Sequence, residues 1–77
     1  MKVLLFAALR ELAGSGSVES EASDVGALLD ELTERFGPAF ARIMEAGTVI
    51  VDGETSGRDR ALGGQEEVAV LPPVSGG

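Results

Sequence analysis

The chain has 77 residues, of which 44% are hydrophobic, so it can bury one small core but cannot form two domains. It has no cysteine and no histidine, which excludes disulfides, thiolate or imidazole metal sites, cysteine nucleophiles and histidine bases. Thirteen acidic and six basic residues give a net charge of −7. This charge disfavours nucleic acids and anionic membranes and favours a positively charged protein as the partner.

The N-terminal region contains a short apolar run at residues 3–9. Arg10 and Glu11 interrupt this run, no signal-peptide cleavage motif follows it, and it is far shorter than the roughly 18 residues of a membrane-spanning helix. We therefore expect a buried strand at this position and a cytoplasmic protein without a membrane segment.

Four segments have the composition of β-structure. Residues 2–6 and 66–71 are apolar on both faces, which predicts two strands side by side in the centre of a sheet, covered on both faces and parallel if a helix connects them. Residues 17–22 alternate between glutamates and small or apolar side chains, as in a half-exposed edge strand. Residues 48–55 enter an Asp52-Gly53 turn, which predicts a hairpin.

A short helix or helical loop is predicted at residues 8–13. Apolar side chains recur there at helical spacing, which places Leu9 and Leu12 toward the core. Gly14 and Gly16 follow, and glycine is the residue that most readily ends a helix and turns the chain.

The main helix is predicted to begin after Asp24, whose carboxylate can accept hydrogen bonds from free backbone N–H groups, and to end at Gly37 and Pro38. A second helical segment follows and stops at Gly47. The apolar positions of both segments recur at helical spacing: Val25, Leu28, Leu29, Leu32, Phe36, Phe40, Ile43 and Met44.

Together these elements predict an α+β fold, a mixed sheet of four or five strands with one main helix packed on one face. Residues 1–71 form the domain, and residues 72–77 form an extended C-terminal tail that ends in Gly-Gly. We expect no metal site, because the nearest candidates, Asp59, Glu66 and Glu67, match no ligand spacing.

The tail is the candidate functional site. Two prolines stop the sheet ladder and keep the exit extended, and the final glycines let a narrow tunnel approach the backbone closely. Six extended residues reach about 20 Å, far enough to carry the terminal carboxylate into the buried site of a partner. The residues in question are Pro72, Pro73, Val74, Ser75, Gly76 and Gly77.

The whole chain resembles the ubiquitin-like sulfur carriers of β-grasp fold and, within them, the small subunits of molybdopterin synthase. The resemblance rests on residues 6–14 after the first strand, on residues 49–54 at the hairpin and, most specifically, on residues 67–77. Two turn positions depart from the pattern: Asp52 stands where relatives usually have Asn, and Gln65 follows Gly64 where Asp is common.

The resemblance implies a sulfur carrier that is not an enzyme by itself. A ubiquitin-activating-like enzyme would use ATP to adenylate the carboxylate of Gly77, which is then converted to a thiocarboxylate. The tail would insert into the large subunit of molybdopterin synthase, in an expected heterotetramer, and donate sulfur to a cyclic pyranopterin phosphate to form the dithiolene of molybdopterin. The chain itself would bind no cofactor. Phe6, Arg10 and Leu71 are expected at the partner interface, with core packing as the alternative for Phe6 and Leu71.

Two other functions fit the same sequence. The first is a sister sulfur carrier, for thiamine, cysteine or transfer-RNA thiolation, or a protein modifier joined through Gly77 to lysines. The second is a non-catalytic β-grasp binding module. The Pro-Pro-Val-Ser sequence before Gly-Gly favours the molybdopterin role over its sisters, and the tail as a whole disfavours the simple binding module.

Overall fold

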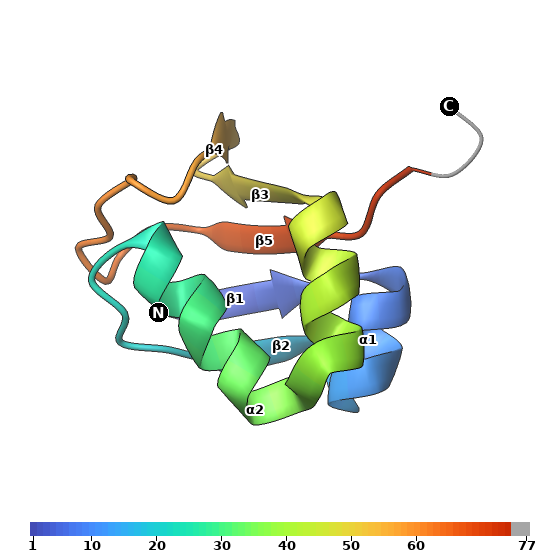
Figure 1. Cartoon of the computed structure of the whole chain (residues 1–77). Helices are drawn as coiled ribbons and strands as arrows, with labels where there is room; N and C mark the ends of the chain where they lie inside the picture. Colours follow the sequence, from blue (N-terminus) through green and yellow to red (C-terminus); the bar gives the residue numbers. More distant parts are fainter. Residues whose placement is uncertain (75–77) are drawn as a thin grey trace.

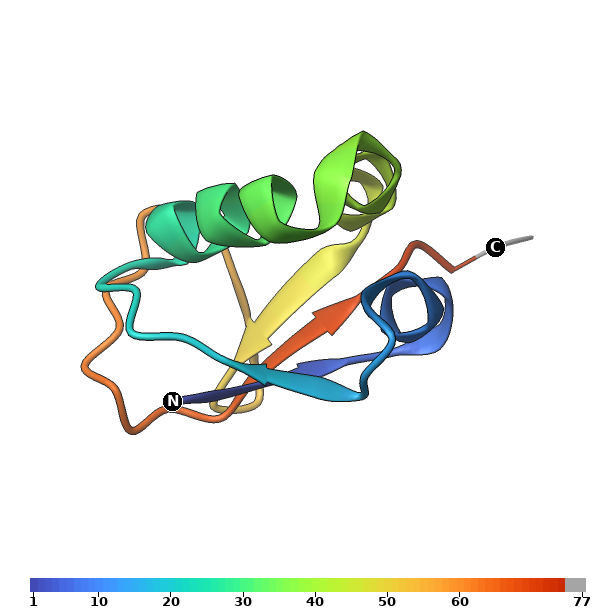
Figure 2. The same ribbon diagram turned by 90° about the horizontal axis from the view of Figure 1, so that it is seen from below.

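The computed structural model describes residues 1–74, which form one five-stranded sheet in the order β2-β1-β5-β3-β4 (Figure 1). A long helix packs across one face of this sheet, and a short one lies at its end (Figure 2). The α+β architecture expected from the sequence is therefore confirmed. The elements are β1 (Lys2–Leu5), α1 (Ala7–Ala13), β2 (Ser17–Glu19), α2 (Val25–Ala46), β3 (Thr48–Val51), β4 (Glu54–Ser56) and β5 (Val68–Leu71).

The two central strands are β1 and β5, which pair in parallel, as predicted. The prediction that both faces of these strands are covered is wrong. Val3 and Val70 point toward α2 and are fully buried, whereas their neighbours Leu4 and Ala69, which face the other side of the sheet, are only half-buried. The helices of residues 1–74 leave the second face of the sheet open, because a chain of 77 residues is too short to build a third layer over it (Figure 2).

Helix α2 bends sharply at Gly37, whose φ of 88° lies in the left-handed region that favours glycine. Pro38 follows and has no backbone N–H to donate to the preceding turn. The sequence prediction of two helical segments divided at these residues is therefore confirmed. The bend lets both halves reach the sheet: Leu32 before it and Phe40 after it are fully buried.

The N-terminus of α2 is capped partly by its own sequence and partly by the β4–β5 connection. The carboxylate of Asp24 accepts a hydrogen bond of 2.7 Å from the third helical residue, as predicted. The N–H groups of Val25 and Gly26 donate to the carbonyl oxygens of Arg60 and Arg58, each at 2.9 Å. The free donors of the first turn thus have acceptors, and the long connection is held against the helix.

Two shorter elements differ from their predicted form. Leu9 of α1 is fully buried, but Leu12, predicted to face the core, is 47% exposed because α1 covers only the end of the sheet. Strand β2 is an edge strand, as predicted, but it ends at Glu19. The backbone of the next residue, Ser20, still exchanges hydrogen bonds of 2.9 and 3.0 Å with Met1, and its hydroxyl donates a hydrogen bond of 2.7 Å to Glu31 on α2.

The β3–β4 hairpin turns at Asp52 and Gly53, whose φ angles of 50° and 83° are both positive, as in a type I′ turn. The Asp52 carboxylate also accepts a hydrogen bond of 2.9 Å from the backbone N–H of Glu67. Relatives usually have asparagine at this position, and the side-chain oxygen of asparagine can accept the same hydrogen bond. The change to aspartate therefore keeps this contact. Between residues 1 and 74, no helix is long and apolar enough to cross a membrane.

Candidate functional site

The tail leaves the sheet from its central strand. Strand β5 is bonded on one side to β1 and on the other to β3, and its last residue, Leu71, pairs with Thr48 of β3. Pro72 then ends the ladder because it has no N–H to donate, and Pro73 and Val74 are exposed. Ser75, Gly76 and Gly77 lie outside the described residues, so the expectations for these positions remain predictions.

The end of α2 touches the backbone at the point where the tail begins. A β-carbon placed on Gly47 would overlap the carbonyl oxygen of Leu71 and lie 3.1 Å from the α-carbon of Pro72. Gly47 has a φ of −95°, which any residue can adopt, so glycine is needed here for close approach and not for a special turn. The sequence analysis assigned Gly47 only a helix-ending role and missed this contact. No local pattern could reveal it, because the partner lies 24 residues away (71 − 47).

Phe6 and Leu71, two of the predicted interface residues, lie beside each other. Leu5 pairs with Val70 in the parallel ladder, so the following residues are neighbours at the ends of β1 and β5. Both side chains point to the open face of the sheet, because side chains alternate along extended backbone. Phe6 is 42% exposed and Leu71 is half-buried. Phe6 therefore does not belong to the core, and the pair forms a small apolar area at the base of the tail.

A strained residue directly follows Phe6. Ala7 has a φ of 50°, in the left-handed region that an alanine seldom occupies. This conformation turns the chain from β1 into α1 within one residue and keeps Phe6 on the open face of the sheet. The strain is therefore located at the candidate interface, which is a common place for it.

Arg10, the third predicted interface residue, lies at the same end of the sheet but apart from this pair. Its side chain packs on Gly16, where a β-carbon would be 3.5 Å from the Arg10 Nε. Gly16 bonds to Leu5 on the β2 side of β1, whereas the tail leaves from β5 on the other side. With strands spaced about 4.8 Å apart, Arg10 and the base of the tail are separated by roughly 10 Å.

Glu66, one of the carboxylates considered for a metal site, holds a loop instead. The Glu66 carboxylate accepts backbone hydrogen bonds of 2.8 Å from Gly63 and 2.9 Å from Gly64. These bonds, that from Gly63 foremost, lower the pKa of Glu66 below its ordinary value of 4.5. Glu66 thus closes the loop before β5, and residues 1–74 contain no cluster of three or more acidic side chains that could hold a metal ion.

The described residues thus hold and orient a tail but supply no acid–base pair or nucleophile beside it. A carboxylate is a poor electrophile until it is acylated to phosphate, so any reaction at the end of this chain requires an activating partner. The domain contributes a rigid base, an apolar area beside it, and an exposed proline-stiffened exit. These are the properties of a protein that presents its C-terminus to other proteins.

Comparison with known proteins agrees with this arrangement. The model of the ThiS family matches residues 3–77. SAMP1 from Haloferax volcanii is 33% identical, with a TM-score of 0.81 over 99% of this chain and 97% of SAMP1. A putative molybdopterin converting factor, subunit 1, from Pyrococcus furiosus is 28% identical, with a TM-score of 0.73 over 95% of both chains.

A chain of the BexX/CysO complex from Amycolatopsis orientalis is 24% identical and shares the fold, with a TM-score of 0.79 over 99% of this chain and 98% of that one. No match was found among curated proteins. The fold is the ubiquitin-like β-grasp, as the sequence predicted. Because the family match covers all but the first two residues, the chain belongs to the ThiS family of ubiquitin-like sulfur carriers.

Proposed function

We propose that this chain is the sulfur carrier subunit of molybdopterin synthase and that Gly77 is its working residue. The observation that carries the proposal is the Pro-Pro-Val-Ser-Gly-Gly tail, which directly follows the strand bonded on both sides. A protein with this arrangement delivers its terminal carboxylate to partners without moving its core.

The chemistry proceeds in three steps, and partner proteins supply the catalytic groups. The Gly77 carboxylate attacks the α-phosphate of ATP on the adenylating enzyme, and pyrophosphate leaves. A persulfide sulfur of a donor protein then displaces AMP to form an acyl persulfide. A thiol reductant cleaves its S–S bond, which leaves a thiocarboxylate on Gly77 and a disulfide on the donor. In the large subunit the thiocarboxylate sulfur attacks a carbon of the cyclic pyranopterin phosphate, because this sulfur is a far better nucleophile than a carboxylate oxygen, and a carbon–oxygen bond of the substrate breaks. Water then hydrolyses the resulting thioester, which leaves the sulfur on the pterin and restores the Gly77 carboxylate.

The sequence immediately before Gly-Gly favours the molybdopterin role over sister pathways. Pro72, Pro73, Val74 and Ser75 resemble the corresponding residues of molybdopterin synthase small subunits. The similarity to the Pyrococcus furiosus protein, described as a molybdopterin converting factor subunit, supports the same assignment.

A protein modifier is the second candidate function, and the similarity to SAMP1, a small archaeal modifier protein, favours it. In that role the activated Gly77 would form an amide bond with a lysine amine of a target protein, and AMP would leave. The two functions share adenylation and differ in the final acceptor, so one chain could serve both.

Intact-mass analysis of the protein isolated from its own cells tests the proposal. We expect a species in which one terminal oxygen is replaced by sulfur, and its absence from a variant lacking Gly77. Deletion of the gene should abolish molybdoenzyme activity, which the wild-type protein restores and the shortened variant does not. Lysine conjugates without any thiocarboxylate would support the modifier instead, and normal molybdoenzyme activity after deletion would refute the molybdopterin role.

A further inference from the structure

Strand β4 forms one edge of the sheet and directs the backbone groups of one residue outward. The N–H of Asp52 donates to the carbonyl oxygen of Glu67, so alternate residues of β3, Ile50 among them, direct their backbone groups toward β5. Thr55 lies opposite Ile50 in the β3–β4 pair. The N–H and C=O of Thr55 therefore point away from β3, toward the free edge of the sheet (Figure 1).

A groove lies beside this edge, between β4 and α2. Its volume of about 350 Å³ falls in the range of small binding sites, about 300–1,000 Å³. Ser56 faces the groove, because it lies opposite the buried Val49, and its side chain is too short to fill the space. Apolar side chains of α2 and β3 line the groove: Val25, Leu29, Met44 and Val49.

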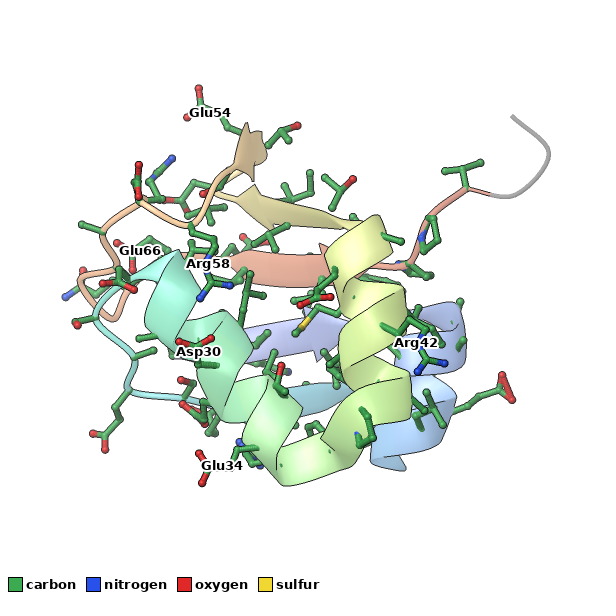
Figure 3. All side chains as sticks on the ribbon, viewed as in Figure 1. Asp30, Glu34, Arg42, Glu54, Arg58 and Glu66 are labelled. Carbon is green, nitrogen blue, oxygen red and sulfur yellow. The ribbon has the colours of Figure 1, made fainter. Side chains whose placement is uncertain are left out.

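The charged groups around the groove leave one carboxylate without a partner. Arg58, at the rim, donates hydrogen bonds of 2.9 Å to Asp30 and 3.3 Å to the carbonyl oxygen of Gly26 (Figure 3). Glu45 also lines the groove and forms no ion pair within residues 1–74. It lies in the last turn of α2, where the helix dipole disfavours negative charge, and this turn has no basic residue. A positive group bound there would interact favourably with both.

The register of β4 defines what an added strand would meet. A segment paired antiparallel with β4 would place one residue opposite Thr55, bonded to its N–H and C=O. Its two neighbours would lie opposite Ser56 and Glu54 and point toward α2, because residues two apart on a strand share a face. The neighbour opposite Ser56 would enter the apolar groove. The neighbour opposite Glu54 would meet a carboxylate whose side chain is 76% exposed.

We propose that this edge groove, between β4 and α2, binds an extended, positively charged segment of a partner protein as an additional strand of the sheet. From its N-terminus, the segment that fits has a basic residue, an apolar residue two positions later and a second basic residue two positions after that. The first basic residue would reach Glu45, which lies near the start of β3 and so at the Ser56 end of β4.

The charge of the chain favours this occupant over a second copy. Two copies would each carry a net charge of −7 and repel each other, whereas a basic segment would be attracted. The groove thus gives a location to the positively charged partner that the net charge favours. The inference goes beyond the proposed function and does not depend on the chemistry of Gly77.

The experiment titrates the isotope-labelled chain with two peptides and follows its backbone amide signals by NMR. The peptides are acetylated and amidated Lys-Thr-Val-Thr-Lys and Glu-Thr-Val-Thr-Glu, which share their length and central residues and differ in charge. We expect the basic peptide to shift the signals of β4 and to slow hydrogen exchange at the Thr55 N–H. It should bind about tenfold more tightly than the acidic peptide.

Two pairs of variants test the contacts. Thr55→Pro removes the outward N–H without removing a bond to β3, and it should weaken binding about tenfold, whereas Thr55→Val keeps the N–H and should bind within about twofold of wild type. Glu45→Lys should also weaken binding of the basic peptide about tenfold. Its control, Glu34→Lys, makes the same charge change on α2 away from β4 and should change affinity less than about twofold (Figure 3).

Several results would overturn the proposal. They are equal affinity for the two peptides, no shift of the β4 signals by the basic peptide at millimolar concentration, and equal binding by Thr55→Pro and Thr55→Val. If Thr55→Pro melts at a lower temperature than Thr55→Val, the pair at Glu45 and Glu34 decides, and equal affinities of that pair would contradict the proposal. Protection of the Thr55 N–H that rises with protein concentration in the absence of peptide would assign the edge to a second copy instead. Sulfur transfer enters none of these measurements, so they test the groove separately from the proposed function.

Discussion

Gly47 lies against the Leu71 carbonyl with no room for a β-carbon between them, so the end of α2 and the start of the tail cannot come closer without a shift of the backbone. The two residues come from different elements, and the contact joins the helix that covers the sheet to the strand that carries the tail. We infer that Gly47 sets the direction in which the tail leaves the domain.

Gly47→Ala should therefore affect both stability and tail presentation. The added methyl group would overlap the Leu71 carbonyl oxygen, so the backbone must shift, at a cost of about 1 to 3 kcal/mol in the free energy of unfolding. We also expect a higher KM for the adenylating enzyme under conditions in which the variant is fully folded. Gly57→Ala is the matched control, because a β-carbon there meets nothing within 4 Å. Equal stability of the two variants, measured by urea denaturation, would contradict this role of Gly47.

Ala7→Gly should stabilise the protein, in contrast to most alanine-to-glycine changes in helices. Ala7 has a φ of 50°, and glycine adopts this conformation without the steric cost that a β-carbon imposes. We expect a gain of about 0.5 to 1 kcal/mol in the free energy of unfolding. Ala8→Gly, one residue later in α1, should lower stability by about 0.5 to 1 kcal/mol. Thermal denaturation of the pair tests the opposite signs, and destabilisation by both would show that Ala7 is not strained.

Leu71→Ala separates a packing role from an interface role. Leu71 is half-buried on the open face of the sheet, whereas Leu5 on β1 is 2% exposed and faces α2. Truncation should therefore cost about 1 kcal/mol at Leu71 and about 2 to 5 kcal/mol at Leu5. At a temperature where both proteins are folded, Leu71→Ala should bind the large subunit more weakly than Leu5→Ala does. A loss at Leu71 as large as that at Leu5, with normal binding, would assign Leu71 to the core.

The elements that sequence analysis predicted well follow rules that act over a few residues. Asp24 caps the helix it precedes, Asp52 and Gly53 form their turn, and Gly37 interrupts its helix, because each feature depends on neighbours in the chain. The contact of Gly47 with Leu71 joins distant positions and leaves no periodic signal in the sequence.

Burial was harder to predict than element type. An apolar strand face or helix position appears the same in sequence whether another layer covers it or not, so Leu4 and Leu12 were assigned more burial than they have. The capping of the α2 N-terminus by the backbone carbonyl groups of Arg58 and Arg60 was also missed. Every residue has a backbone carbonyl, so residue types in the sequence do not indicate which one will accept such a hydrogen bond. Within the candidate site, the tail was recognisable from residue types alone, whereas its supporting contacts required the fold.

Stability should depend on pH through Glu66. The backbone N–H of Gly63, followed by others in the loop, lowers the pKa of Glu66 in the folded protein below 4.5. A lowered pKa stabilises the fold above the unfolded-state value, and the stabilisation is lost as pH falls through the folded-state value. Glu66→Gln should therefore be less stable than wild type near neutral pH, and the difference should shrink as pH falls below the ordinary glutamate pKa.

The matched control for this prediction is Glu67→Gln. It makes the same charge change on a neighbouring carboxylate that accepts no hydrogen bond from residues 1–74. Urea denaturation at several pH values should show a larger pH-dependent difference for Glu66→Gln than for Glu67→Gln. Parallel curves for the two variants would mean that the loop contacts of Glu66 do not contribute to stability.

Removal of Gly77 should abolish function and leave the domain intact. The buried core ends at Val70 and the last strand ends at Leu71, so the free energy of unfolding should stay within about 0.5 kcal/mol of wild type. Addition of one residue after Gly77 should have the same effect, because the carboxylate then lies one residue, up to about 3.6 Å, beyond its position for activation. Both variants should fail in ATP–pyrophosphate exchange while their urea denaturation curves match that of wild type. Normal adenylation and sulfur transfer by a chain that ends at Gly76 would refute the role of Gly77. Such a result would mean that the activity does not depend on the position of the terminal carboxylate.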